Sequence, residues 1–391
     1  MSGTAVVAHG GGPTPVLNAS LAGLIAEAAK HPIGRLLGAH FGVQGLVEGR
    51  YHDLFAIGPG LLDAIRQAPG SAIGTSRRPL TPEDDRRILD DFRRRDVRWF
   101  FYTGGNGSME TALRFDRLAR ESGYELQVVG IPKTIDNDLA GTDHSPGYGS
   151  SARFYAHAVR DIGEDNRSLP WPVCLVETLG RNVGWVVAST AHACHNDEYA
   201  PHLIYFPECG VSIDKICADV EAVVARLGRC VVAVCEGQVD QDGRWFNTEL
   251  TTAPGARGGV PVNTGHVLAR LVWDRTGLRA RSEKPGLLGR CSAPLVSEVD
   301  RDEAWRCGQA AVRAAMRGES GQMISLRRAP GHRYEAEPGL TPLAEVAGVA
   351  RPFPLDWIND SRNHVRPEYL EWSRPLVGEI SRHPALSAPT T

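Results

Sequence analysis

Short apolar runs alternate with longer amphipathic segments along the chain as far as residue 328, a pattern typical of strands that alternate with helices. The apolar runs predict strands at residues 5–8, 99–102, 126–131, 172–177, 203–206 and 231–235. The helical spacing of apolar positions predicts helices from residue 18 and at about 82–95, 109–122, 152–163, 212–227, 265–274 and 302–317. This order predicts an α/β fold with doubly wound, mostly parallel sheets.

Two stretches lack the alternation. Residues 240–262 are polar and rich in glycine and proline, so we expect a surface excursion there. Residues 330–391 are interrupted by prolines; we expect one short helix near 342–347 and partial disorder elsewhere in this tail.

The most informative polar segment is GIPKTIDNDLAGTDHSPGYGSS, residues 130–151. It follows a predicted buried strand and places Asp136 and Asp138 two residues apart, behind Lys133 and Thr134. Two such acids cannot both be buried without partners, because an unpaired buried carboxylate is costly. They suit a general base together with a group that holds a metal or orients the substrate. When the two acids are considered alone, a solvated turn is the more common explanation of this spacing.

Two glycine-rich loops also follow predicted strands and precede predicted helices. They are GGGPTP at residues 10–15 and GGNGS at residues 104–108. Backbone N–H groups at such a turn, together with a helix amino end, bind phosphate. Residues 74–78, GTSRR, add two guanidinium groups that suit bidentate phosphate contacts. In a parallel sheet the loops at the carboxyl ends of the strands converge, so together they predict a phosphate site beside the two acids.

Composition narrows the functional classes. The 391-residue chain is 42% hydrophobic, and its net charge of −3 gives no electrostatic reason to expect nucleic acid or membrane as a partner. No apolar run has transmembrane length, and we expect a cytoplasmic protein. The eight cysteines are scattered without a C-x-x-C motif, which favours reduced thiols.

In this order, the segments resemble the phosphofructokinase family, and more closely its short diphosphate-dependent 6-phosphofructokinase branch. The matching segments are GGGPTPVLNAS, GTSRR, GGNGSMETA, PKTIDNDLAGTDHSPGYGS, VETLGRNVGW, APHLIYFPE and CEG. The resemblance implies two Rossmann-like domains with the active site in the cleft between them. The phosphoryl-donor domain would comprise 1–147 plus about 290–340, and the sugar-phosphate acceptor domain 148–289 plus about 341–391.

The resemblance also implies roles for individual residues. Asp136 would be the general base, with Thr134 beside it, and Arg77 would offset charge on the transferred phosphoryl group. The donor would be held by Gly12, Gly105, Asn106, Gly107, Ser108 and Lys133. The acceptor would be held by Thr134, Asp136, Asp138, Leu179, Gly180, Arg181, Glu236, Arg281 and Arg290. Asn106 and Asp138 would contact Mg²⁺. Arg281 would reach a neighbouring subunit, which implies a homodimer or homotetramer.

The chain departs from the family pattern at both ends of the implied site. Asn106 stands where relatives that use ATP have aspartate. Lys133 is typical of the diphosphate branch, whereas Gly107 is typical of ATP users, so either donor is open and diphosphate is favoured. In the acceptor site, Pro172 stands in place of a basic residue, Leu287 in place of an aromatic or histidine side chain, and Gly289 in place of a glutamine. The alternatives are therefore another sugar or cyclitol as acceptor, and a non-catalytic protein that binds a phosphometabolite.

Overall fold

The computed structural model describes residues 3–169, 171–247, 261–331 and 333–384. These residues divide into two compact units. Among the described residues, unit 1 comprises those of 3–151 and 290–352. Unit 2 comprises those of 152–289 and 353–384. The expected assignment of residues 341–352 to the second domain is wrong, because the strand that ends at Pro342 pairs with a strand of unit 1.

Unit 1 is built on a seven-stranded sheet with the order β11-β10-β5-β4-β1-β2-β3. Its strands are β1 (Gly3–His9), β2 (Ile33–Ala39), β3 (Tyr51–Asp53), β4 (Val97–Gly104), β5 (Gln127–Pro132), β10 (Gln322–Arg328) and β11 (Ala336–Pro342). Only β3 and β11, at the two edges, run antiparallel to their neighbours. In register, His9 pairs with Thr103 and Gly104 pairs with Pro132, so β1, β4 and β5 end level. The three loops singled out by the sequence therefore leave one edge of the sheet together.

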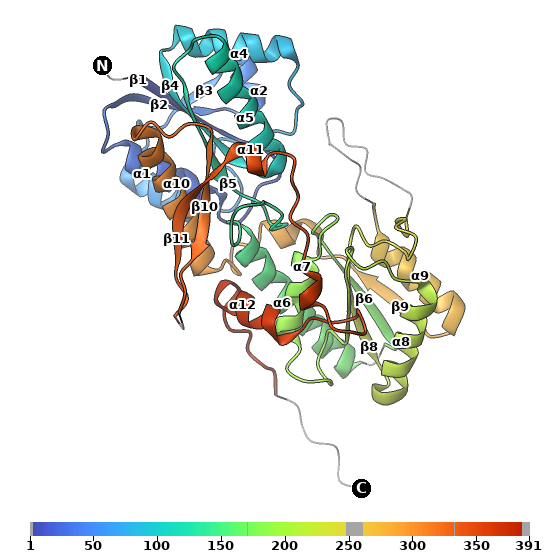
Figure 1. The fold of residues 1–391 in the computed structure, drawn as a ribbon. Coiled ribbons are helices and arrows are strands. Elements are labelled where there is room, and N and C mark those ends of the chain that lie inside the picture. The colour runs from blue at the N-terminus through green and yellow to red at the C-terminus, as the bar shows by residue number, and fades with distance from the viewer. Residues whose placement is uncertain (1–2, 170, 248–260, 332, 385–391) are drawn as a thin grey trace. The chain divides into compact units, whose positions relative to one another are not determined.

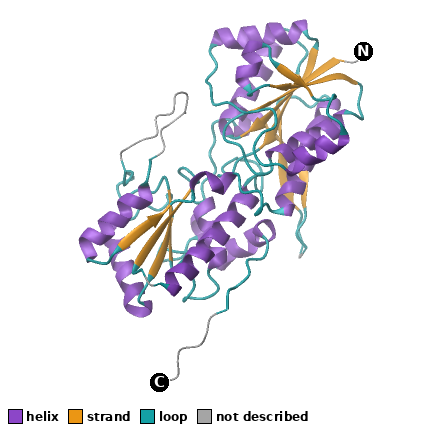
Figure 2. Cartoon of the chain, turned by 180° about the vertical axis from the view of Figure 1, so that it is seen from behind, coloured by secondary structure: helices purple, strands orange, loops and turns teal. Residues whose placement is uncertain are grey.

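Helices cover both faces of this sheet (Figures 1 and 2). One face packs against α2 (Val43–Glu48), α4 (Pro82–Arg94), α5 (Asn106–Glu121) and α11 (Leu343–Val346). The other face packs against α1 (Leu17–Ala28), α3 (Pro59–Gln67) and α10 (Glu298–Met316). Strands covered on both sides are buried on both faces, which explains their continuous apolar sequence. α4 starts at Pro82 because Thr81 and Asp84 form a capping box before it.

Unit 2 contains a four-stranded parallel sheet with the order β7-β8-β6-β9. Its strands are β6 (Val173–Thr178), β7 (Leu203–Tyr205), β8 (Cys230–Cys235) and β9 (Ala280–Glu283). The helices are α6 (Tyr148–Ser168), α7 (Trp185–Ser189), α8 (Ile213–Leu227), α9 (Thr264–Thr276) and α12 (Pro367–Val377). Short 3-10 turns lie at Thr190–Ala193, Gly286–Arg290 and Leu355–Trp357. All eight cysteines are free, as expected.

The predicted disorder of the tail is wrong for its described part. Residues 353–384 pack on unit 2 through an aromatic cluster in which Trp185 of α7 contacts Phe353, Trp357 and Trp372. Phe353 is 1% exposed, so this segment contributes to the core in spite of its prolines. The last residues, from 385, and most of the predicted 240–262 excursion lie outside the described residues.

Candidate active site

The glycine loop after β1 lies against the loop after β4. The Gly10 N–H donates to Thr103 O at 2.9 Å, and the Gly11 N–H donates to Ser76 O at 3.1 Å. A Cβ on Gly10 would lie only 2.3 Å from Ser108 Oγ, so any larger residue there would push the two loops apart. The close approach predicted from the glycine pattern is present within unit 1.

The loop after β4 leads directly into the 16-residue helix α5, whose N-cap is Gly105. In the described part of the chain, no side chain caps its first turn. The Ser108 N–H donates to Gly105 O at 2.9 Å, whereas the N–H groups of Asn106 and Gly107 before it have no capping side chain, and they carry the positive end of the helix dipole. Gly105, Asn106 and Gly107 thus form a backbone surface suited to an anion such as a phosphate, with the Ser108 side chain next to it.

Lys133 lies beneath the glycine loop, and it is 3% exposed. Its Nζ donates to Gly10 O at 2.8 Å and to Gly12 O at 2.7 Å. Burial lowers the pKa of Lys133 to about 8; Asp136 opposes this shift, and Arg77 and Arg290 add to it. The ammonium group therefore fixes the loop conformation and places a positive charge under the predicted phosphate site.

Two further cations gather at the same loop. A Cβ on Gly12 would lie 2.6 Å from Arg290 Nη1 and 3.2 Å from Arg77 Nη2. Glycine at position 12 thus leaves room for both guanidinium groups against the loop backbone. The sequence placed Arg290 with the acceptor residues, and in the structure its guanidinium lies beside the predicted donor loop.

Asp136 lies in a loop whose two halves are hydrogen bonded to each other. The Asp136 N–H donates to Thr134 Oγ1 at 3.1 Å. The Thr134 N–H in turn donates to Pro146 O, and Asn137 Oδ1 accepts from the Ser145 N–H at 2.9 Å. Asn137 has a positive φ of 55°, which asparagine tolerates better than most residues. Asp136 is therefore held between two fixed neighbours, and its side chain is half-buried.

Asn106 and Asp138 were expected to contact a metal ion, and the structure brings them together. Asn106 Nδ2 donates to a carboxylate oxygen of Asp138 at 2.9 Å. Among the described residues, the buried Asn106 Oδ1 has no hydrogen-bond partner. No group of three or more His, Cys, Asp or Glu within the described ranges could enclose a metal. The Asp138 carboxylate and the unpartnered Asn106 Oδ1 are oxygens of the kind that Mg²⁺ prefers, since this ion is usually held by one or two protein oxygens together with water and substrate phosphates.

Arg351 is a contributor that sequence reasoning missed. Its guanidinium donates to Asn137 O at 2.9 Å, to Thr142 O at 2.7 Å and to Asp143 O at 2.8 Å, and its backbone N–H donates to Asp138 O. These bonds clamp the acidic loop from the segment that follows α11. No local pattern around Arg351 signals the role, because its partners lie more than two hundred residues earlier in the chain.

Four of the predicted acceptor residues, Leu179, Gly180, Arg181 and Glu236, follow the carboxyl ends of β6 and β8 in unit 2, whereas Arg281 pairs with Cys174 near the amino end of β6. Arg181 has a positive φ of 56°, a strained conformation for this residue type. Its N–H donates to Glu236 Oε1 at 3.0 Å, and its carbonyl accepts from Cys235 Sγ. Burial raises the pKa of Glu236, and the hydrogen bond from Arg181 opposes that shift. The exposed Arg181 side chain and the Glu236 carboxyl thus lie on a loop held in one conformation.

The three departures from the family pattern have different structural settings. At position 289 a Cβ would lie 2.5 Å from the Tyr155 ring, so glycine is required by the tyrosine that packs there. Tyr155 Oη in turn accepts from the Leu179 N–H at 3.0 Å. Leu287 is 62% exposed. Pro172 offers only its carbonyl, which accepts from the Cys230 N–H.

Arg281, expected to reach another subunit, lies exposed on β9. Within the described chain it pairs with Glu283 and stands 5.8 Å from the Trp171 ring, on which Arg279 stacks at 4.1 Å. The structure contains one chain, so its role across subunits stays a prediction.

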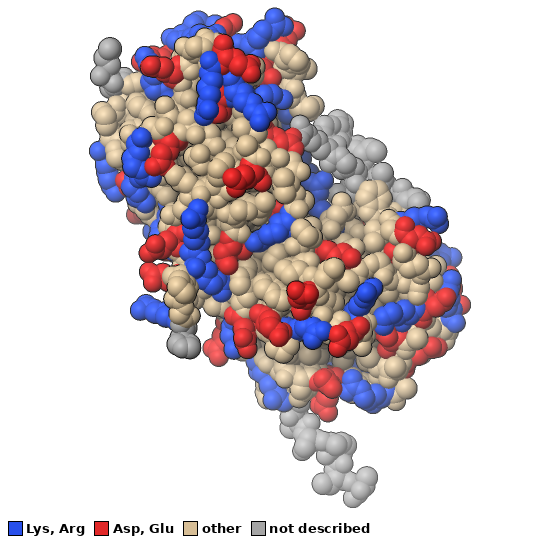
Figure 3. Space-filling model, in the orientation of Figure 1, with Lys and Arg blue, Asp and Glu red and all other residues tan. Residues whose placement is uncertain are grey.

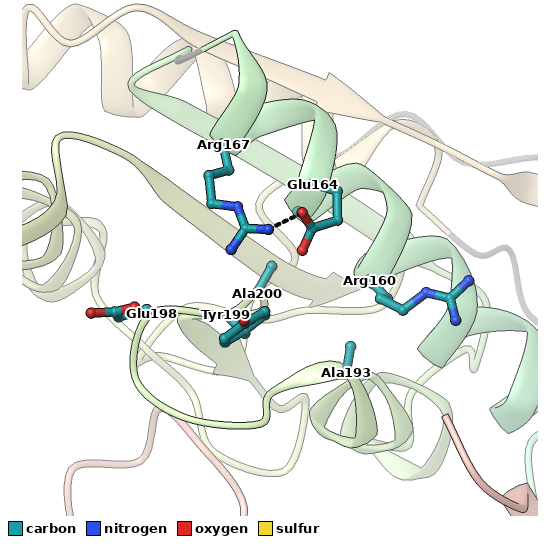
Figure 4. A pocket seen from close by; sticks show the side chains of 8 residues that line it. Arg160, Glu164, Arg167, Ala193, Glu198, Tyr199 and Ala200 are labelled. Carbon is teal, nitrogen blue, oxygen red and sulfur yellow. Dashed lines mark hydrogen bonds and ion pairs between the residues drawn. The ribbon is translucent and has the colours of Figure 1, made fainter. Parts of the chain in front are cut away.

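A pocket in unit 2 is lined by none of the predicted site residues (Figure 4). Arg160, Glu164 and Arg167 of α6 line it, opposite the segment 193–200. Arg167 pairs with Glu164 and stands 5.3 Å from the Tyr199 ring, while Arg382 donates to Tyr199 Oη at 2.8 Å and lowers the pKa of the tyrosine. Since these cations already have partners, we give the pocket no part in the chemistry.

Charges of both signs are interspersed over the face shown in Figure 3. Such mixing creates no broad field of one sign on that face, so recognition of an anion depends on local groups such as Lys133.

Comparison with known proteins agrees with the geometry. The sequence pattern of a family described as phosphofructokinase matches residues 4–315. The chain belongs to the phosphofructokinase family. Enzymes of this family are phosphotransferases that generally use a divalent metal.

Among individual phosphofructokinase relatives, a pyrophosphate–fructose 6-phosphate 1-phosphotransferase of Rhodospirillum rubrum is 36% identical over 384 residues, covering 96% of this chain and 94% of the relative. A sulfofructose kinase of Alkalicoccus urumqiensis is 32% identical over 375 residues, covering 95% of this chain and 94% of the relative. A pyrophosphate-dependent phosphofructokinase of Nitrosospira multiformis has a solved structure that is similar with a TM-score of 0.88 and 30% identity, covering 98% of this chain and 94% of that one. The predicted family and α/β fold are confirmed.

Within the described residues, no helix has both the length and the apolar composition needed to cross a membrane.

Proposed function

We propose that the protein transfers a phosphoryl group from diphosphate to the 1-hydroxyl of fructose 6-phosphate, with Asp136 as the general base. The observation that carries this proposal is the position of Lys133. Its ammonium group is bonded to the carbonyls of Gly10 and Gly12 and fills the space beneath the glycine loop. A long side chain there favours a short donor over a nucleotide, whose additional phosphate would need that space.

Binding of the donor follows from the groups around this lysine. The amino end of α5, which has no side-chain cap, would bind phosphate oxygens through the backbone N–H groups of Asn106 and Gly107. Lys133, Arg77 and Arg290 would offset the charge that develops on the transferred group. Mg²⁺ held by Asn106 Oδ1 and Asp138 would supply further neutralisation of the phosphate oxygens. Phosphoryl transfer depends mainly on such positioning and charge stabilisation.

The proton of the attacking hydroxyl would move to the Asp136 carboxylate. Asp136 is suited to this because its backbone is fixed between Thr134 and Asn137, while its side chain is only half-buried. The acceptor would be held in unit 2 by Arg181, whose guanidinium is exposed on a rigid loop, and by Glu236, which fixes that loop. General-base catalysis of this kind contributes about 10²- to 10⁴-fold to the rate.

The test is an assay of the purified protein with Mg²⁺, fructose 6-phosphate and either diphosphate or ATP. Formation of fructose 1,6-bisphosphate and inorganic phosphate from diphosphate is the expected result. Turnover with ATP alone would reject diphosphate as the donor. Turnover with neither donor on any sugar phosphate would reject the phosphotransferase assignment and favour a binding protein.

A second acceptor is favoured by a specific observation in unit 2. Pro172 provides no cation, Leu287 is exposed, and the Tyr155 ring excludes a side chain at Gly289. The changes at Pro172 and Gly289 lower the polarity expected around the far end of the sugar, as a less highly charged substituent would require. The relative described as a sulfofructose kinase acts on such a substrate by its name. Competition between fructose 6-phosphate and sulfofructose, at equal concentrations with diphosphate as donor, would decide by the ratio of the two products.

A further inference from the structure

A buried network of charged residues joins the acidic loop to α10. His144 is 1% exposed, and its Nε2 lies 2.6 Å from Glu303 Oε2. Its Nδ1 lies 2.8 Å from Asp143 Oδ2. Tyr334 donates to the other Glu303 oxygen, and Arg328 pairs with Asp143 at 3.1 Å. The proposed chemistry uses none of these residues.

His144 is charged in this network, because two carboxylates face its two ring nitrogens. Burial alone would lower the pKa of His144, but Glu303 and Asp143 outweigh burial and raise the pKa to about 9. The remaining groups that face the ring are Arg306 of α10, 3.9 Å from Glu303, together with Arg328 of β10 and Tyr334. A protonated imidazole donates from both nitrogens, so it can hold the loop and α10 together.

The connection from His144 to Asp136 runs through the two halves of the loop. Ser145, next to His144, donates its N–H to Asn137, the residue after Asp136. Pro146 accepts from the Thr134 N–H, and Thr134 Oγ1 accepts from the Asp136 N–H. Displacement of residues 144–146 would thus shift Thr134 and Asn137, which lie on either side of Asp136 in the loop. Asp300, also on α10, fixes the end of the same segment by accepting from the Gly147 and Ser150 N–H groups.

We propose that the buried His144–Glu303 ion pair is a positioning device for the proposed base, which holds Asp136 in place by anchoring the far half of its loop to α10. The inference rests on the proposed function. His144 does not contact the reacting atoms, and its effect passes through Ser145 and Asn137. A shift of about 1 Å at a reacting group costs on the order of 10²-fold in rate, so an anchor of this kind affects turnover more than binding.

The experiment compares His144→Gln with His31→Gln in the full-length protein. Glutamine retains a hydrogen-bonding group but no charge. His31, which follows α1 in the same unit, provides the matched control, because it also pairs with a glutamate, Glu27 of α1, at 3.4 Å. With diphosphate and fructose 6-phosphate, His144→Gln should lower kcat by about tenfold to 10²-fold and change each KM by less than about threefold. His31→Gln should leave both constants unchanged.

The pH profile separates positioning from simple stabilisation. Because the folded pKa of His144 lies above the usual histidine value, its stabilising ion pair is complete below about pH 6.5 and is lost as the pH rises through about 9. The kcat of the wild type should fall as the pH rises through about 9, and the kcat of His144→Gln should show no such fall. A His144→Gln enzyme with wild-type kcat and the wild-type pH profile, even one with a lower melting temperature, would overturn the proposal.

A readout without turnover keeps the inference distinct from the proposed function. Backbone amide exchange at Thr134 and Ser145 should be at least about tenfold faster in His144→Gln than in wild type and unchanged in His31→Gln. If wild type shows no phosphotransferase activity, the proposed function fails, and unchanged exchange would reject the anchor independently. Glu303→Gln, which keeps the packing of α10, tests the same pair should His144→Gln not fold.

Discussion

The donor cluster in unit 1 and the acceptor cluster in unit 2 are built in opposite ways. Around the glycine loop, Lys133 is buried, the loop backbones touch, and the acidic loop is clamped by Arg351 and by α10. In unit 2, Arg181 and Arg281 are exposed, and so is Leu287, although the loop backbone at Arg181 is fixed. A site closed by its own packing can change little without losing function, whereas exposed side chains can be exchanged at low cost. Donor chemistry should therefore be the constant part of this protein and acceptor choice the variable part.

Replacement of Asp136 by asparagine should have the largest effect. The change keeps size and hydrogen bonding but removes the proton acceptor, so kcat should fall by about 10³-fold, within the range typical of a general base. Each KM should change by less than about threefold, since binding depends on other groups. Steady-state kinetics with diphosphate tests this; an Asp136→Asn enzyme with at least a tenth of wild-type kcat would contradict the role.

Replacement of Lys133 by glycine tests whether the donor cluster in unit 1 selects diphosphate. Loss of the ammonium group removes a buried cation and frees the space beneath Gly10 and Gly12. We expect kcat/KM for diphosphate to fall by about 10²-fold, as when one charge-stabilising donor is lost. Use of ATP should rise. Equal losses with both donors would mean that the lysine supports the fold without selecting the donor.

Replacement of Pro172 by arginine tests whether the acceptor cluster in unit 2 sets the choice of acceptor. A cation there should raise kcat/KM for fructose 6-phosphate by about tenfold, the gain expected from one additional charge-assisted contact in a partly exposed site. The preference between diphosphate and ATP should not change. The matched control is Pro82→Arg at the start of α4, in the other unit. An unchanged kcat/KM for fructose 6-phosphate would mean that Pro172 is not the cause of an altered acceptor preference.

The pH dependence of donor use should be the smallest effect. Because the pKa of Lys133 is lowered from its usual value near 10.5 to about 8, the ammonium form is lost as the pH rises through about 8. The kcat/KM for diphosphate should then decline over that range by a few-fold, since one of three nearby cations is neutralised. Lys133→Met should have low activity and no such decline. The same decline in the methionine variant would assign it to another group.

Much of unit 1 could be predicted because its signals are local. The strands ending at His9, Gly104 and Pro132 are short apolar runs closed by glycine or proline, and the helices after them have clear apolar spacing. The segment from 33 to 67 could not be divided into elements from its sequence, because its scattered glycines obscure the periods of β2, α2, β3 and α3. β9, β10, β11 and α12 were also missed.

The parts of the site that could not be predicted depend on distant partners. Arg351 clamps Asn137, and Asp300 and Glu303 anchor residues 144–150, across 150 residues or more. No spacing rule along the chain links such pairs. The location of Arg290 beside Gly12 likewise follows from how the chain returns to unit 1, which composition and periodicity do not encode. Short motifs therefore identified the reacting groups, and the fold supplied the residues that hold them.

The most direct test of the account is a matrix of kcat/KM values for two donors, diphosphate and ATP, and two acceptors, fructose 6-phosphate and sulfofructose, measured for the wild type, Lys133→Gly and Pro172→Arg. We predict that the wild type prefers diphosphate with either acceptor, that the lysine change alters only the donor preference, and that the proline change alters only the acceptor preference. A wild type that uses ATP as well as diphosphate, or a lysine variant with an altered acceptor preference, would contradict the separation of a constant donor site from a variable acceptor site.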